Sequence, residues 1–215
     1  MQFIQGKALR RRGPPTKELQ ERCKPWLFQG VPASYQFAVA IQKPSQGEMF
    51  PENEIPPEVL TRTFLSILKA TSEDPEDKLR SLVPDDEYRK TFLKLSRNLA
   101  PTGKSYSELE LNSTVPQEKV IFSPSSRRAI SETLKKSVPK DEDGSEEITL
   151  RGVLRAVHLD QDWLELSVAA NKVSVYGVGE SVDDLIGPMV NHDVIVRAFR
   201  DRKEKYRFVD IEQDE

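Results

Sequence analysis

The chain has 215 residues, room for one or two domains, and its net charge of −3 excludes a global electrostatic attraction to nucleic acid or membrane. A single cysteine, Cys23, excludes an intramolecular disulfide and is typical of a reducing compartment, so we expect a cytoplasmic protein. The apolar runs are too short for a signal peptide or a bilayer span, so we expect no membrane partner.

Residues 1–29 predict a basic, partly flexible arm. The segment carries a net charge of +5, and its cluster Arg10, Arg11 and Arg12 is followed by Gly-Pro-Pro. Repelling charges and paired prolines oppose packing, so this segment is expected to be mobile at its start.

Residues 30–138 predict a helix-rich α+β module. A strand is expected at 34–41, which is rich in β-branched and aromatic residues. Helices are expected to begin near Pro57, near Asp77 and at Asp85 or Asp86, because proline and carboxylates favour the first turn. The apolar stripes expected to face the core are Leu60, Phe64, Ile67 and Leu68 on the first helix and Tyr88, Phe92, Leu95 and Leu99 on the third.

Basic side chains occupy the other face of the third helix and recur on a fourth helix that begins after Ser123. They are Arg89, Lys90, Lys94 and Arg97, then Arg127, Arg128, Lys135 and Lys136. Such a surface can hold a phosphate, but Lys and Arg on a helix are more commonly just solvated. We expect these side chains to be solvated.

A charged linker at 139–147 is predicted to separate the module from a C-terminal small β-barrel over residues 148–212. Five β-patterned segments with one helical turn after the third indicate an OB-like or an SH3-like barrel. Leu164, Leu166 and Val168 alternate with polar neighbours, which predicts one buried face. Gly152 in the long first strand indicates a bend or bulge. The fold class is therefore α+β.

Two short motifs are candidate chemical sites. His158, Asp160 and Asp162 alternate and offer nitrogen and oxygen metal ligands, but a polar hairpin turn explains them more simply. The segment 177–181 has two glycines after a strand but lacks the lysine and the third glycine of a phosphate loop. We expect no catalytic residue, no metal and no cofactor.

A candidate nucleic-acid surface is sharper. Residues 200–205 form a basic loop that would be the last loop of an OB-like barrel, where oligonucleotides commonly bind. Trp163 and Tyr176 are candidate stacking platforms on the second and third strands. The full candidate set is Trp163, Tyr176, Arg197, Arg200, Arg202, Lys203, Lys205 and Arg207, with Arg10, Arg11 and Arg12 in the arm.

The leading hypothesis is a non-catalytic interaction or regulatory protein that acts through protein contacts. The alternatives are a nucleic-acid-binding protein that uses the barrel and the basic arm, and an enzyme whose site assembles only in space. The protein partner is not identified by the sequence, and the oligomeric state is left open.

Overall fold

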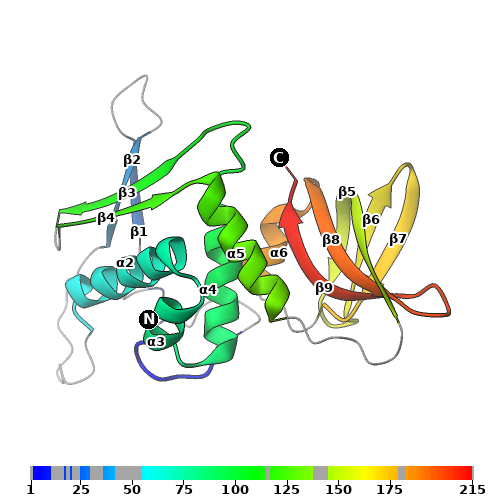
Figure 1. Ribbon diagram of the computed structural model, residues 1–215, viewed down its shortest axis with the longest axis horizontal. Coiled ribbons are helices and arrows are strands. Elements are labelled where there is room, and N and C mark those ends of the chain that lie inside the picture. The colour runs from blue at the N-terminus through cyan, green and yellow to red at the C-terminus, as the bar shows by residue number, and fades with distance from the viewer. Residues whose placement is uncertain are drawn as a thin grey trace.

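The computed structural model describes residues 2–10, 17, 20, 25–29, 36–41, 55–114, 117–137, 145–178 and 183–214. A helical module lies on one side of the molecule and a five-stranded sheet on the other (Figure 1). The predicted α+β class and the predicted five-stranded C-terminal sheet are confirmed. Within the described residues no helix is both long and apolar enough to span a membrane.

The helical module contains helices and two separate hairpins. In chain order its elements are β1 (Pro25–Gln29), β2 (Phe37–Ile41), α2 (Pro57–Glu73), α3 (Asp77–Leu82), α4 (Asp86–Leu99), β3 (Leu109–Thr114), β4 (Gln117–Phe122) and α5 (Pro124–Lys136). Local signals place the helix starts: the Asp85 carboxylate accepts the backbone N–H of Tyr88, and the Ser123 hydroxyl accepts that of Ser126. Pro57 and Pro124 occupy first-turn positions.

The predicted apolar stripes reach the core of the module only in part: Ile67, Leu68 and Tyr88 are buried as predicted. Phe64 is 51% exposed, and Leu95 and Leu99 are also exposed, so the prediction that they face the core is wrong. On α4 the buried positions include Leu93 and Arg97 instead. Arg97 is buried because α4 also contacts the C-terminal sheet, where Asp210 and Ile211 bind its guanidinium.

The start of the chain packs against α4. The Phe3 ring lies edge-on to Tyr88 and Phe92, with centroid distances of 5.4 and 5.7 Å. The Tyr88 hydroxyl donates to the carbonyl of Lys7 at 2.8 Å. The start of the chain therefore packs against α4, although its charges and prolines were expected to oppose packing. Arg11 and Arg12 lie outside the described residues.

Each strand of the C-terminal sheet pairs with two neighbours, so the pairings form a closed ring. Its elements are β5 (Glu146–His158), β6 (Trp163–Val168), β7 (Asn171–Tyr176), α6 (Asp183–Ile186), the 3-10 turn η2 (Gly187–Met189), β8 (Asp193–Arg200) and β9 (Tyr206–Gln213). The strand order is β5-β6-β7-β9-β8, and β8 pairs back onto the long strand β5. The pairing of β7 with β9 is parallel, whereas the other pairings are antiparallel.

The inner face of this sheet is apolar. Leu154, Leu164 and Leu166 are fully buried there, and Ile186 of α6 joins the same cluster. Gly152 is required by a close approach, because a Cβ at this position would overlap the carbonyl oxygen of Ser167. The register shift predicted near it falls two residues later, between Leu154 and Ala156.

Candidate nucleic-acid interface

The outer surface of the C-terminal sheet has two regions with different surroundings. Helices α4 and α5 lie against β9, and Arg197 of the neighbouring β8 binds the same Asp210 as α4, whereas β6 and β7 are on the side that faces away from the helical module (Figure 1). The first region is called the covered face below, and the second, together with the adjoining start of β9, the open face.

Asp210 of β9 is the centre of the covered face. Its carboxylate is 3% exposed and accepts a two-pronged hydrogen bond from the guanidinium of Arg97. Arg197 donates to it at 3.0 Å, and the amine of Lys94 lies 3.6 Å away. Arg97 also donates to the carbonyl of Ile211 at 2.7 Å. One buried carboxylate therefore holds three cations from α4 and β8.

Burial and the neighbouring charges shift the pKa values of Asp210 and Lys94 in opposite directions. Burial alone would raise the pKa of Asp210, but Arg97, Lys94 and Arg197 outweigh it and lower the pKa to about 2. Burial lowers the pKa of Lys94, and the carboxylate of Asp210 opposes that shift only in part. Asp210 is therefore ionised at neutral pH.

Arg127 of α5 adds a second connection to the covered face. Its guanidinium donates to the carbonyls of Arg97 and Ala100 at 2.7 and 2.9 Å, and it lies 3.3 Å from the carboxylate of Glu212 in β9. The expectation that these basic helix residues are solvated is wrong for Arg97, which is 1% exposed, and for Lys94 and Arg127, which are largely covered. They hold the helices on the sheet.

The open face carries a row of aromatic and basic side chains that are paired in register. His158 of β5 is opposite Trp163 of β6, and Trp163 is opposite Tyr176 of β7. The row continues through Arg207 of β9 to Phe199 of β8. Residues directly opposite each other share one side of a sheet, so the three rings His158, Trp163 and Tyr176 lie side by side on its outer surface.

The loop between β5 and β6 fixes the first two rings of this row. The rings of His158 and Trp163 are stacked, with centroids 5.7 Å apart and planes 27° apart. The backbone N–H of Gln161 donates to Nδ1 of His158 at 3.0 Å, and the indole N–H of Trp163 donates to the Gln161 side chain at 3.1 Å. A neutral imidazole whose Nδ1 accepts a hydrogen bond carries its proton on Nε2, so neither nitrogen of His158 is available as a metal ligand in this arrangement. This argues against the metal alternative for His158, Asp160 and Asp162. Among the described residues no such cluster fit to hold a metal is found.

The loop between β8 and β9 borders the other end of the row. The carboxylate of Asp201 accepts the backbone N–H groups of Lys203 and Lys205, both at 2.8 Å, and these bonds lower its pKa. These two hydrogen bonds from the loop backbone to the Asp201 side chain stabilise the conformation of the loop. Between residues 200 and 207 there are five basic and two acidic residues, a net charge of +3. The guanidinium of Arg207 lies over the ring of Phe199, 5.5 Å from its centroid.

The structure gathers most of the candidate residues but separates two groups from them. Trp163, Tyr176, Arg207 and the basic loop are on the open face, whereas Arg197 is on the covered face and pairs with Asp210. The N-terminal segment 2–10, which includes Arg10, lies beneath α3 and α4, on the other side of the molecule from β6 and β7 (Figure 1).

Three contributions were missed from the sequence. His158 was weighed as a metal ligand, although its ring is stacked on Trp163. The alternation of aromatic residues on both sides of a hairpin turn was the available signal for that contact. For Arg97 and Asp210, which are 113 positions apart, no local pattern could have indicated a contact.

Comparison of the chain with models of known families, with curated proteins and with solved structures finds no match.

Proposed function

We propose that the chain is a non-catalytic binding protein that holds single-stranded nucleic acid on the open face of its C-terminal sheet. The observation that carries this proposal is the row of His158, Trp163 and Tyr176, in register and bordered by the basic loop. Aromatic rings on a sheet bind bases by stacking, and nearby cations bind the phosphates.

An OB-like barrel, rather than an SH3-like one, is part of this proposal. Three features support it: the ring of pairings β5-β6-β7-β9-β8, the α6–η2 helical segment after the third strand, and the long first strand shared by β6 and β8. In OB-folds the second and third strands and the loops after the first and fourth strands commonly grip oligonucleotides. In this chain those elements are β6, β7 and the loops 159–162 and 201–205.

The charges on the open face orient the proposed ligand. The loop after β5 carries Asp160 and Asp162, whereas the loop after β8 carries Arg202, Lys203 and Lys205. Phosphates are therefore expected along the β9 side and bases over β6 and β7. Because His158 and Trp163 are already stacked on each other, the pair offers one platform and Tyr176, which is 48% exposed, offers a second. Two stacked bases are expected.

Fluorescence anisotropy with labelled single-stranded DNA and RNA of about 12 nucleotides tests the proposal, in salt of about 50 and about 200 mM. We expect binding that weakens as salt rises and is tighter for single strands than for a duplex. Loss of both Trp163 and Tyr176 to alanine is expected to reduce affinity by at least about 10-fold, from stacking energies of roughly 1–3 kcal/mol per base.

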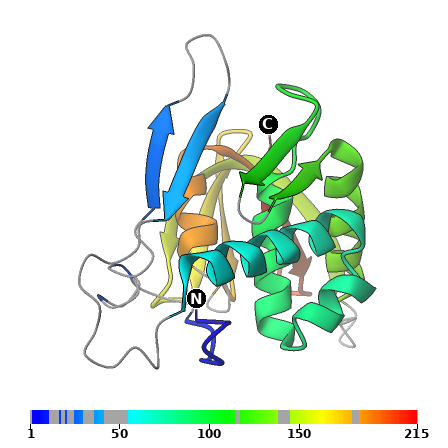
Figure 2. The ribbon, with the colours of Figure 1, turned by 90° about the vertical axis from the view of Figure 1, so that its left-hand side faces the viewer.

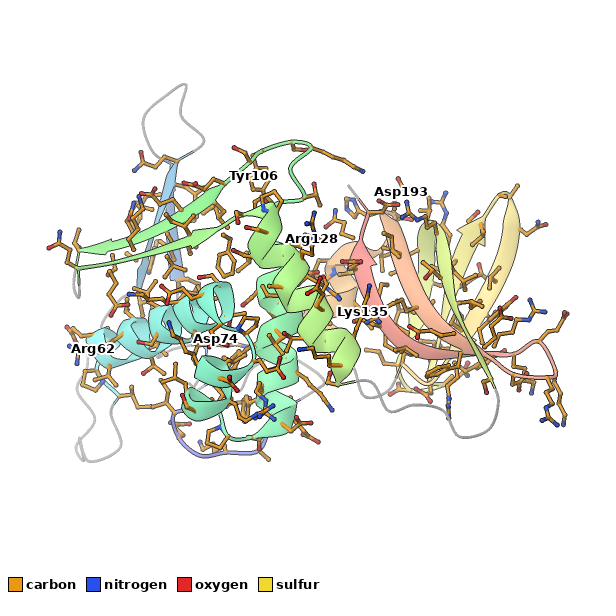
Figure 3. The ribbon with its side chains drawn as sticks, viewed as in Figure 1. Arg62, Asp74, Tyr106, Arg128, Lys135 and Asp193 are labelled. Carbon is orange, nitrogen blue, oxygen red and sulfur yellow. The ribbon has the colours of Figure 1, made fainter. Side chains whose placement is uncertain are left out.

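Tyr106→Ala is the matched control, since Tyr106 is 43% exposed and lies on the helical side of the molecule (Figure 3). Its affinity should equal that of the wild type. Absence of binding at about 100 μM protein, weaker than ordinary non-specific binding, contradicts the proposal. Equal losses in the Tyr106 variant contradict the assignment of the face.

Protein contact, the leading hypothesis from the sequence, is favoured by a separate surface. The hairpin of β1 and β2 exposes large apolar side chains on the helical module, remote from β6 and β7 (Figures 1 and 2). A chain with both surfaces can bind a protein and a nucleic acid at once.

A further inference from the structure

The row of side chains on the open face continues past Tyr176. Arg207 of β9 is directly opposite Tyr176 in the parallel pairing of β7 with β9, and Phe199 of β8 is opposite Arg207. Residues that are directly opposite each other share one side of a sheet. The side chain of Arg207 is therefore in line with the rings of Trp163 and Tyr176, one strand further along the sheet.

Two contacts hold the Arg207 side chain in this row. Its guanidinium carbon lies over the ring of Phe199, 5.5 Å from the centroid, which is within the range of a cation–π interaction. A Cβ at Gly177, the residue after Tyr176, would lie 3.6 Å from Cγ of Arg207, so the stem of the arginine passes beside this glycine. Arg207 is exposed whereas Phe199 is partly buried, so the guanidinium is the outer member of the pair.

The chemistry of this pair suits a nucleic-acid base. A guanidinium is planar and, like an aromatic ring, it stacks on bases. A flexible arginine loses conformational entropy when a base orders it. The contacts with Phe199 and Gly177 already restrict the Arg207 side chain, so less entropy is lost when a base binds there.

The groups on either side of Arg207 have other roles. The loop 200–205, which borders it, carries the cations expected to bind phosphate. At the end of the row, Phe199 is opposite Glu147 of β5, whose carboxylate lies 3.5 Å from Arg197. A carboxylate repels the phosphates of an approaching strand, so the positions for bases end at Arg207.

We propose that Arg207, supported by Phe199, is a third stacking position, so that three consecutive bases lie over β6, β7 and β9. The inference rests on the proposed function of the open face and extends it by one nucleotide. Adjacent strands of a sheet are about 4.8 Å apart, whereas stacked bases rise by about 3.4 Å per nucleotide. Successive bases must therefore separate to reach successive strands, which an unpaired strand does more readily than a duplex.

Arg207→Lys separates stacking from charge, because lysine keeps the positive charge but has no planar group. In fluorescence anisotropy with a labelled single strand of about 12 nucleotides, this variant should lose about 5- to 100-fold in affinity, the range for one stacked base. The slope of log affinity against log salt should stay at the wild-type value, because no charge is lost. Arg151→Lys is the matched control: its side chain is 70% exposed on β5 of the same sheet, and its affinity should equal that of the wild type.

An abasic strand of the same length provides a second control. It keeps the phosphates and has no base to stack, so the wild type and Arg207→Lys should bind it equally. Phe199→Leu removes the ring beneath Arg207 and keeps an apolar side chain, so it should also weaken binding to the ordinary strand. The loss in the double variant should be smaller than the two single losses combined, because both changes act through one contact. Circular dichroism confirms that each variant is folded.

The outcomes distinguish this inference from the proposed function. If the wild type binds and Arg207→Lys binds equally well, the third position is overturned and the proposed function stands. An equal loss on the abasic strand overturns it too, because Arg207 would then contact the phosphates, and so do single losses that simply add in the double variant. Absence of binding by the wild type overturns both proposals.

Discussion

Two arginines three positions apart on β8 have opposite surroundings. The side chain of Arg197 is 14% exposed and pairs with the buried Asp210, whereas that of Arg200 is 44% exposed and lies 3.6 Å from the exposed Glu204. Both are basic residues on the same strand. The difference arises because Arg197 lies in the covered part of the sheet, next to α4, whereas Arg200 is the last residue of β8 and begins the exposed loop. Residue type alone therefore does not indicate the role.

The two faces should also differ in what each charge contributes to stability. On the covered face the cations are desolvated, and removal of their carboxylate leaves them buried without compensation. On the open face water solvates each charge, so the contribution of an ion pair there is small. The predictions below follow from this difference.

The largest effect is expected from Asp210→Ala. The free energy of unfolding, measured by urea denaturation, should fall by about 3–5 kcal/mol, because Arg97 stays buried without its partner. Glu73→Ala is the control: Glu73 pairs with Lys78 at 2.9 Å, both side chains are about half exposed, and the loss should be below about 1 kcal/mol. Equal losses would show that the covered face is not a packed interface.

Acid should remove part of the same stabilisation. The pKa of Asp210 is about 2 in the folded protein and about 3.9 when unfolded, so its contribution is full above pH 4 and is lost as the pH falls towards 2. The loss is worth about 2 kcal/mol. Denaturation curves between pH 5 and pH 2 measure it, and those of Asp210→Asn should be flatter over that range. A wild type and variant with parallel pH dependence would contradict the lowered pKa.

Tyr176→Ala should separate binding from stability. We expect a loss of affinity for single strands of about 5- to 100-fold, because one stacking platform is removed. The free energy of unfolding should change by less than about 1 kcal/mol, because the ring is half exposed and its removal leaves little cavity. Anisotropy and urea denaturation give the two values. A large loss of stability with unchanged affinity would assign Tyr176 to the fold.

The smallest change in stability is expected from Arg202→Ala with Lys203→Ala, which should stay within about 0.5 kcal/mol. The same change should reduce the slope of log affinity against log salt by about 1.4, the value for two phosphate contacts on a single strand. Arg62→Ala with Lys69→Ala on α2 removes the same charge from exposed positions, with Arg62 at the opposite end of the molecule (Figure 3). This control should keep the wild-type slope, and an equal reduction would indicate a general charge effect.

The elements of the fold were largely predictable because their signals are local. Pro57, Asp85 and Ser123 mark helix starts, and the alternation from Trp163 to Val168 marks a half-buried strand. The buried side of α4 was predictable only in part. Tyr88 is buried as its stripe predicts, whereas Leu95 and Leu99 of the same stripe are exposed. Arg97 is buried as well, because its partner Asp210 comes from a strand that is distant in the sequence.

The candidate site was predictable in part for the same reason. Trp163, Tyr176 and the basic loop were found because exposed aromatic residues and clustered cations are visible in the sequence itself. Arg197 lies apart from them on the covered face, since its partner Asp210 is brought to it by the pairing of β8 with β9. His158 was predicted to lie in a polar hairpin turn, with a metal ligand as the alternative, and its stacking on Trp163 across the turn was not predicted.

The sequence by itself determined the α+β class, the strands and helical turn of the C-terminal half, and the charge of each loop, because each depends on residues within one or two turns of the chain. Only the tertiary structure decided which face of the sheet is covered. It also decided which cations are buried and that three rings from three strands form one row. Those properties depend on contacts between residues as far apart in the sequence as Arg97 and Asp210. Whether a charged side chain is desolvated depends on the residues that surround it in the folded protein, which its local sequence does not indicate.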